Sequence, residues 1–256
     1  MPHNAFNSLK TFQPAPGKMG QYYSLPELAK RFPNVKFAII DFPQGALPDK
    51  PTNVRGLLFR EQEAGYLVGY LAALMEKARK GPDVISSVGG QKIPPVDRYI
   101  AGYKAGAKKA DPKIKVLNAY SQSFTDLAAC KEIALDQIAK GSKVVFAVAG
   151  GCGLGALDAA KEKGVQGIGV DADQAYLGAH ILTSAEKHVD LAVFNAIKSV
   201  QDGTFKGGTN TINTVENDGV GIGTIGPAGQ KYADQVEEIR QQIADGTIKD
   251  IPDTVK

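Results

Sequence analysis

At residues 144–156 the chain reads VVFAVAGGCGLGA: a β-branched apolar run, then glycines among small residues, then the start of a helical pattern. A short apolar run bounded by glycines is typical of a buried strand, and the pattern after it predicts a helix. Strand, glycine loop and helix together form one unit of a mostly parallel sheet. The stretch therefore predicts the α/β class.

The same alternation of short strands and amphipathic helices extends in both directions from this stretch. The predicted strands span residues 36–41, 84–88, 115–119, 143–149, 167–170 and 181–184. The predicted helices span residues 25–31, 60–80, 96–110, 125–140, 155–163, 187–201 and 228–245. Residues 43–53, rich in Pro, are expected to form a long surface loop or a crossing between lobes. Residues 207–223 are expected to hold two strands around the turn Asn217-Asp218-Gly219.

Length, charge and hydropathy exclude several classes of protein. The 256 residues suffice for one large α/β domain or two small ones. The net charge of +3 comes from 30 basic and 27 acidic residues that are spread along the chain, so a nucleic-acid partner is not expected. The longest apolar stretch, residues 64–75, is too short to span a bilayer. The N-terminus lacks the basic and apolar regions of a secretory signal.

Cysteine and histidine offer little chemistry. Cys130 and Cys152 are too few for a disulfide framework and lack the spacing of a zinc site. Two buried free thiols are the default interpretation, and a single Cys130–Cys152 disulfide, which would indicate an oxidising compartment, is the alternative. The three histidines are scattered. Neither a metal site, a cofactor nor a catalytic residue is therefore predicted.

The glycine loop has three interpretations. As a ligand loop, Gly150 and Gly151 let a ligand approach the backbone, and the helix after them offers unpaired N–H groups. As a dinucleotide fingerprint, Gly151-x-Gly153-x-x-Ala156 is followed at the end of the next strand by Asp171, where a ribose-binding acid would lie. As a purely structural element, the glycines make a tight turn between strand and helix. No hydride-transfer residues follow, so the ligand loop is the preferred interpretation.

Acidic and basic residues at two later strand ends are further candidates. The carboxylate of Asp171 can accept hydrogen bonds from vicinal hydroxyls, whereas Asp173 fits an Asx-turn or a helix cap better. In Thr183-Ser184-Ala185-Glu186-Lys187, Ser184 is expected to cap a helix with Lys187 on its first turn, where the helix dipole disfavours a cation. Lys187 should therefore have a partner such as Asp171 or a ligand oxygen, unless it is simply solvated.

Two acids at the start of a predicted helix do not form a catalytic pair. Glu61 and Glu63 complement the helix dipole, and side chains two positions apart point to different faces of a helix.

Seven segments in order resemble the basic membrane protein family, which comprises substrate-binding proteins of transporters similar to purine-nucleoside receptor lipoproteins. They are PNVKFAIID, FREQEAGYLVGYLAALM, SSVGGQKIPPVDRYIAGYKAGAKKADP, SFTDLAACKEIALDQIAKG, VVFAVAGGCGLGALDAAKEKG, GIGVDADQ and ILTSAEKHVDLAVF. The resemblance runs from about Leu25 to the C-terminus.

The resemblance implies a type I periplasmic-binding-protein fold, in which two α/β lobes with parallel sheets close on a ligand, and it implies no catalysis. Asp171 matches the acid expected to hold ribose hydroxyls, Lys187 a nearby basic partner, and Gly150 with Gly151 the loop that faces the ligand. By position in the fold, Asp41 at a strand end and Phe124 with Asp126 are further pocket candidates, and Phe124 can stack on a planar base.

The resemblance also implies a domain division and partners. Residues 1–56 and 178–205 are expected to form lobe one, which would be incomplete because fewer residues precede strand 36–41 than in the family layout. Residues 57–177 and 206–256 are expected to form lobe two. The expected function is that of a substrate-binding protein of an ABC importer, with a purine nucleoside or related ligand, an ABC permease as partner and an extracytoplasmic location. An NAD(P)-dependent oxidoreductase using residues 151–156 and a ligand sensor without transport are the alternatives.

Overall fold

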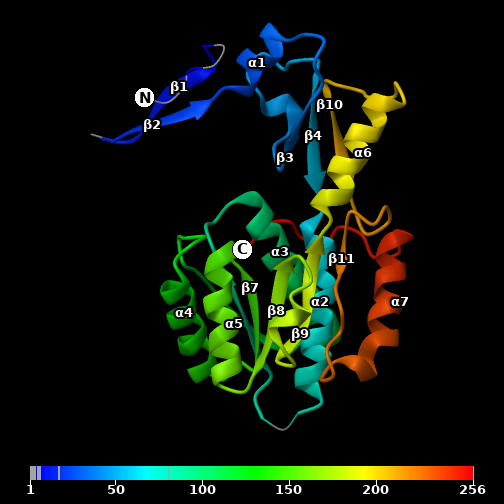
Figure 1. Ribbon diagram of the computed structural model, residues 1–256. Coiled ribbons are helices and arrows are strands. Elements are labelled where there is room, and N and C mark those ends of the chain that lie inside the picture. Colours follow the sequence, from blue (N-terminus) through cyan, green and yellow to red (C-terminus); the bar gives the residue numbers. More distant parts are fainter. Residues whose placement is uncertain (1–3, 5–6, 17, 80, 256) are drawn as a thin grey trace. The chain divides into compact units, whose positions relative to one another are not determined.

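The chain divides into two compact units in a computed structural model that describes residues 4, 7–16, 18–79 and 81–255 (Figure 1). Unit 1 comprises Met1–Leu58 and Val189–Ile212, and unit 2 comprises Phe59–His188 and Asn213–Lys256. The division differs from the expected ranges in three places. Residues 57–58 belong to unit 1, although lobe two was expected to begin at residue 57. Residues 178–188 belong to unit 2, and residues 206–212 belong to unit 1.

Unit 1 is built on a three-stranded sheet of order β10-β4-β3. Its elements are the hairpin β1 (Leu9–Ala15) and β2 (Lys18–Tyr23), α1 (Leu25–Arg31), β3 (Phe37–Ile40), a 3-10 turn (Gln44–Ala46), β4 (Val54–Phe59), α6 (Val189–Gln201) and β10 (Thr209–Asn213). β3 pairs with β4 in parallel, with Phe37 opposite Val54. Ala29, Leu47 and Val54 form the buried core on the α1 side of this sheet.

One buried amide joins α1 to the sheet of unit 1. The Nδ2 group of Asn53 lies 3.0 to 3.1 Å from the carbonyl oxygens of Ala29, Phe32 and Val35, and Asn53 is 8% exposed. The Ala29 carbonyl lies in the last turn of α1, and those of Phe32 and Val35 follow the end of the helix. Asn53 therefore fixes the position of α1 just before β4 begins.

Unit 2 is built on a six-stranded sheet of order β11-β9-β8-β7-β5-β6, in which only β11 runs antiparallel to its neighbour. Its strands are β5 (Val84–Gly89), β6 (Lys115–Tyr120), β7 (Val144–Val148), β8 (Gln166–Asp171), β9 (Ile181–Lys187) and β11 (Val220–Ile222). Its helices are α2 (Glu61–Lys77), α3 (Pro94–Ala110), α4 (Leu127–Ala139), α5 (Gly153–Glu162) and α7 (Ala233–Ala244), with 3-10 turns at Gly150–Cys152, Ala175–Leu177 and Gln230–Tyr232.

The strand order of unit 2 fixes which helices cover which face. The chain moves from β5 outward to β6 through α3, and then back across β5 to β7 and β8 through α4 and α5. Because such crossovers are right-handed, a reversal of direction places α3 on one face and α4 with α5 on the other. The helix α2 packs against α3, and α4 packs against α5 (Figure 1).

Four glycines let α2 and α3 approach closely. A Cβ atom on Gly65 or Gly69 would lie 2.2 or 2.1 Å from the carbonyl oxygens of Tyr99 and Tyr103, and a Cβ atom on Gly102 would lie 2.0 Å from that of Gln62. Gly106 makes the same contact with Tyr66. Each helix thus places glycines four residues apart against backbone of the other, and any side chain there would force the helices apart.

The structure confirms the α/β class and differs from the predicted elements at three points. The strands β1, β2 and β4 were not predicted. Ser184 and Lys187 lie in β9 rather than in a helix cap, because β9 is paired on both sides, with β8 and β11. The two strands predicted in residues 207–223 exist as β10 and β11, but they belong to different sheets and form no hairpin.

Candidate functional site

The carboxyl ends of β5, β7 and β8 lie along one edge of the unit 2 sheet, because these strands are parallel. At this edge the chain leaves β5 toward one face, through α3, and leaves β7 toward the other, through α5. Adjacent strands whose connections diverge in this way make a topological switch point, and ligands of open α/β sheets bind there. The residues at this point are Gly90, after β5, and Ala149–Cys152, after β7.

Phe124 lies at the switch point. A Cβ atom on Gly90 would lie 2.4 Å from the Phe124 ring, and one on Gly150 would lie 3.6 Å from it. The ring therefore packs on bare backbone of the loop after β5 and beside the loop after β7, while Phe124 itself follows β6. Phe124 is half-buried. Glycine is required at position 90 because a side chain would occupy the place of the ring.

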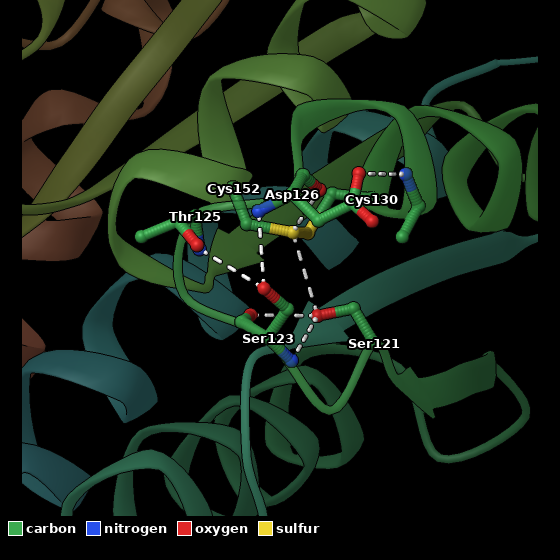
Figure 2. Close-up of a disulfide and its surroundings, with 7 residues drawn as sticks. Ser121, Ser123, Thr125, Asp126, Cys130 and Cys152 are labelled. Atoms are coloured by element: carbon green, nitrogen blue, oxygen red, sulfur yellow. Dashed lines mark hydrogen bonds between the residues drawn. A yellow bond between two sulfur atoms is a disulfide. The ribbon is translucent and has the colours of Figure 1, made fainter.

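A disulfide between Cys130 and Cys152 joins α4 to the loop after β7 (Figure 2). The two Cα atoms are 5.6 Å apart, and both residues are fully buried. The default interpretation of two free thiols is thus wrong, and the alternative is confirmed. The backbone N–H of Cys152 donates to the carbonyl oxygen of Phe124 at 2.9 Å, so a residue of the disulfide is bonded directly to the backbone of Phe124.

Asp171 ends β8 at the same edge. Its φ of 67° is in the left-handed region, where Asp is tolerated better than most residues, and its side chain is exposed. The hydroxyl of Tyr99, from α3, donates to its Oδ1 at 3.4 Å. The carboxylate is therefore joined to α3 through the Tyr99 hydroxyl.

Lys187 ends β9 and is 8% exposed. Its Nζ lies 3.0 Å from Oε1 of Glu61 and 4.7 Å from the centre of the Phe59 ring. Arg98 approaches the other oxygen, Oε2 of Glu61, at 3.4 Å. Glu61 is fully buried, so the two cations balance a carboxylate that has no contact with bulk water. Lys187 thus has a charged partner, but this partner is Glu61 rather than the expected Asp171 or a ligand oxygen.

Asp173 stabilises the turn after β8. Its Oδ1 accepts from the backbone N–H of Ala175 at 3.1 Å, as in an Asx-turn, and its Oδ2 accepts from that of Thr224 at 3.1 Å. Burial raises the pKa of Asp173, but the hydrogen bonds from Thr224, Ala175 and Ser184 together lower it below its ordinary value. The structural interpretation of Asp173 is therefore the correct one.

Of the remaining candidate residues, one caps a helix, two lie beside Phe124, and one belongs to unit 1. Asp126 is exposed and caps α4, since its Oδ1 accepts from the N–H of Ala129 at 3.1 Å. Gly150 has a φ of 53°, which favours glycine, and a Cβ atom on Gly151 would lie 3.3 Å from the Phe124 carbonyl oxygen. Asp41 follows β3 in unit 1, where its φ is 61°. The site on unit 2 thus gathers Asp171, Phe124, Gly150 and Gly151, while Asp41 belongs to the other unit.

The glycines of residues 151–156 also serve packing. A Cβ atom on Gly155 would lie 2.0 Å from the carbonyl oxygen of Leu127, at the start of α4. Gly155 is therefore required for the close approach of α4 and α5. This structural demand explains part of the glycine pattern that also suggests a dinucleotide fingerprint.

Sequence reasoning missed the residues that support the site from α2 and α3. Glu61 was explained by the helix dipole alone, and Arg98 and Tyr99 were not singled out. A buried acid at a helix start differs from an exposed one only in its surroundings, so no local signal identifies it. As expected, Glu61 and Glu63 have different partners: Glu63 accepts from the N–H of Val215 at 2.7 Å.

Neither a metal-binding cluster nor a membrane-spanning helix occurs among the described residues. No group of three or more His, Cys, Asp or Glu side chains in residues 4, 7–16, 18–79 and 81–255 is placed to hold a metal ion. Within the same residues, no helix is both long and apolar enough to cross a membrane.

Residues 22–254 match the family described as ABC transporter substrate-binding protein PnrA-like. The chain belongs to this family. A protein from Lactococcus lactis named ABC transporter nucleoside-binding protein BmpA is 34% identical over 238 residues, which are 86% of this chain and 65% of the relative. Basic membrane protein A1 from Borrelia garinii is 38% identical over 195 residues, 73% of this chain and 56% of the relative. The resemblance to basic membrane proteins is confirmed.

A lipoprotein and a solved structure are also similar to this chain. An uncharacterized lipoprotein from Pyrococcus abyssi is 35% identical over 88% of this chain and 58% of its own length. The chain thus spans 56% to 65% of the length of these three curated relatives. An ABC transporter solute-binding protein from Aeropyrum pernix is 28% identical, with a TM-score of 0.77 over 89% of this chain and 74% of that one. The predicted type I periplasmic-binding-protein fold is confirmed, and the oxidoreductase alternative is not favoured.

Proposed function

We propose that this protein is the ligand-binding component of an ABC importer, and that it binds a purine nucleoside or a related small polar ligand at the carboxyl edge of the unit 2 sheet. The observation that carries the proposal is that an aromatic ring, a carboxylate and bare glycine backbone lie along one edge of the sheet, at and beside its topological switch point. A nucleoside consists of a planar base and a sugar with vicinal hydroxyls, and these groups match that set. The nucleoside-binding relative from Lactococcus lactis supports the same class of ligand.

Each residue of the site has a chemical role in this proposal. The Asp171 carboxylate accepts hydrogen bonds from the ribose hydroxyls, which are charge-assisted and therefore strong. The Phe124 ring stacks on the base, and Gly150 and Gly151 allow the ligand to approach the backbone. Lys187 ends the strand next to the one that Asp171 ends, and it stays a candidate for a ligand contact, with Glu61 as its partner in the structure. Such a site binds and orients a ligand without a nucleophile or a proton-transfer residue, so we propose no catalysis.

Further predictions rest on family membership. The partner is an ABC permease, and the location is extracytoplasmic, as the name of the Pyrococcus lipoprotein indicates for that relative. The Cys130–Cys152 disulfide supports this location, because disulfides persist in oxidising compartments. Asp126 and Asp41 stay candidates for ligand contacts, the first beside Phe124 and the second in unit 1.

A thermal-shift panel tests the class of ligand. Adenosine, guanosine, inosine, ribose and NAD are each added to the purified chain, and a ligand that binds only the folded state raises the melting temperature. We expect a concentration-dependent rise with at least one purine nucleoside and none with NAD. A response to NAD without a response to nucleosides would favour the dinucleotide alternative.

A further inference from the structure

The segment that carries Phe124 is bonded partly within itself and partly to the end of β5. Between the end of β6 and the start of α4, the N–H groups of Thr125 and Asp126 are bonded by the Ser123 hydroxyl oxygen at 3.1 and 3.0 Å, within the segment itself. Gln122 has a φ of 59° and donates its N–H to the Gly90 carbonyl oxygen at 3.0 Å. The Ser121 N–H also donates to the Gly89 carbonyl oxygen at 2.8 Å, so the start of the segment is tied to the end of β5. The part around Phe124 is bonded within the segment, and its position depends on contacts from outside.

The loop after β7 holds this segment from one side. The Cys152 N–H donates to the Phe124 carbonyl oxygen, and the Cys152 sulfur lies 3.4 Å from the Ser121 hydroxyl oxygen. Figure 2 shows Ser121 and Ser123 below the disulfide and Thr125 on its Cys152 side. Cys152 therefore contacts the Phe124 segment through both its backbone and its side chain.

The disulfide fixes Cys152 itself. Cys130 lies in the first turn of α4, one turn after the Asp126 cap, and 22 residues separate it from Cys152. Both cysteines belong to the buried core cluster with Ala134, Ala156 and Leu157. The covalent bond thus ties the glycine loop, which has little side-chain packing of its own, to a helix whose start is continuous with the Phe124 segment.

We propose that the Cys130–Cys152 disulfide is a positioning element that fixes the Phe124 ring as the wall for a planar base. This inference rests on the proposed function for its ligand, but its geometric part does not. Three contacts hold the segment: the disulfide, the Cys152–Phe124 hydrogen bond and the Asp126 cap of α4. Together they keep the Phe124 side chain packed on Gly90. The cysteines touch no ligand in this account and act through Phe124.

Hydrogen exchange tests the geometric part without any ligand. The parent and a C130A/C152A variant are compared by mass spectrometry, with C130V/C152A as a second variant that fills more of the vacated volume. We expect faster exchange at residues 121–130 and 149–153, and unchanged exchange in the peptides of α2 and α3. Equal exchange at residues 121–130 in parent and variant would overturn the proposal.

Inosine binding tests the functional part through a double-mutant cycle. Removing the disulfide should weaken inosine binding about tenfold in the parent, which is within the range of one aromatic–base stack. In an F124A background the same removal should change the dissociation constant less than about twofold, because the residue through which the disulfide acts is already gone. L157A, which disturbs the same core cluster, serves as a control of lowered stability and should leave the constant unchanged.

The outcomes separate the two proposals. Equal weakening in the parent and in the F124A background would show that the disulfide acts on overall stability, and would overturn the positioning role. Failure of the parent to bind inosine or another purine nucleoside would instead overturn the proposed function, and the exchange rates would then decide alone whether the disulfide holds Phe124.

Discussion

Replacing Gly69 by alanine tests the close crossing of α2 and α3 that supports Glu61, Arg98 and Tyr99. The added Cβ atom would lie 2.1 Å from the carbonyl oxygen of Tyr103 and 2.8 Å from its carbonyl carbon. Both obstacles are backbone atoms of a helix, which no rotamer change can move. The two helices must therefore separate by about 1 Å to restore ordinary contact, and the dispersion contacts along their interface weaken.

The expected loss of stability follows from two opposing terms. Overpacking of this kind costs about 1–3 kcal/mol, and we expect the upper end because backbone atoms cannot yield. Alanine in place of glycine within a helix stabilises that helix by about 1 kcal/mol. The free energy of unfolding should therefore fall by about 2 kcal/mol, which for a chain of this size lowers the melting temperature by about 4–8 °C.

Urea unfolding followed by circular dichroism measures the change. G221A is the matched control in the same unit, since a Cβ atom on Gly221 meets only a His188 ring carbon at 3.9 Å. The control should lie within about 0.5 kcal/mol of the parent. A G69A variant as stable as the parent would refute the close crossing.

Two further predictions concern buried charges in unit 2. E61Q and K187M should each lower the free energy of unfolding, by up to about 5 kcal/mol. E61Q removes the carboxylate that Lys187 and Arg98 contact, and K187M removes one of the two cations that contact the buried Glu61. In urea unfolding the double variant should cost less than the sum of the two single variants, and additive costs would contradict the buried pair. Burial raises the pKa of Glu76 to about 7, against an opposing effect of Arg79. Between its ordinary value of 4.5 and about 7 the native state binds more protons than the unfolded chain, so Glu76 favours the folded state at low pH and this contribution is lost as pH rises. Between pH 5 and pH 8 the free energy of unfolding of E76Q should fall by on the order of 1–3 kcal/mol less than that of the parent. An identical fall in parent and variant would contradict the raised pKa.

Regular elements with a strong local pattern could be predicted from the sequence. The helix α1 has the predicted bounds, and β7 lies within one residue of them at each end, because its apolar run is continuous and ends at glycines. The strand β4 could not be found in this way. Its sequence VRGLLF is interrupted by Arg and Gly, and its stability comes from pairing with β3 and β10.

The positions of the proposed site residues could be predicted where they follow from a strand end, and not where they depend on tertiary contacts. Asp171 and the glycines after β7 stand at strand ends in the sequence as they do in the structure. Lys187 was assigned to a helix start because Ser184 and Glu186 resemble a cap, while pairing with two neighbouring strands overrides that local pattern. Glu61 meets Lys187 across 126 residues of sequence, a contact that no periodicity reveals.

Calorimetric titration of adenosine and inosine into the parent, D171A and D136A tests the central claim most directly. Asp136 is an exposed acid on α4, paired with Lys140, and its replacement controls for loss of one charge. We predict saturable binding of at least one of the two nucleosides to the parent and to D136A with the same affinity, and a loss of about tenfold or more in D171A, the range of one or two charge-assisted hydrogen bonds. Equal affinity in the parent and D171A would contradict the claim that this carboxylate holds the ligand.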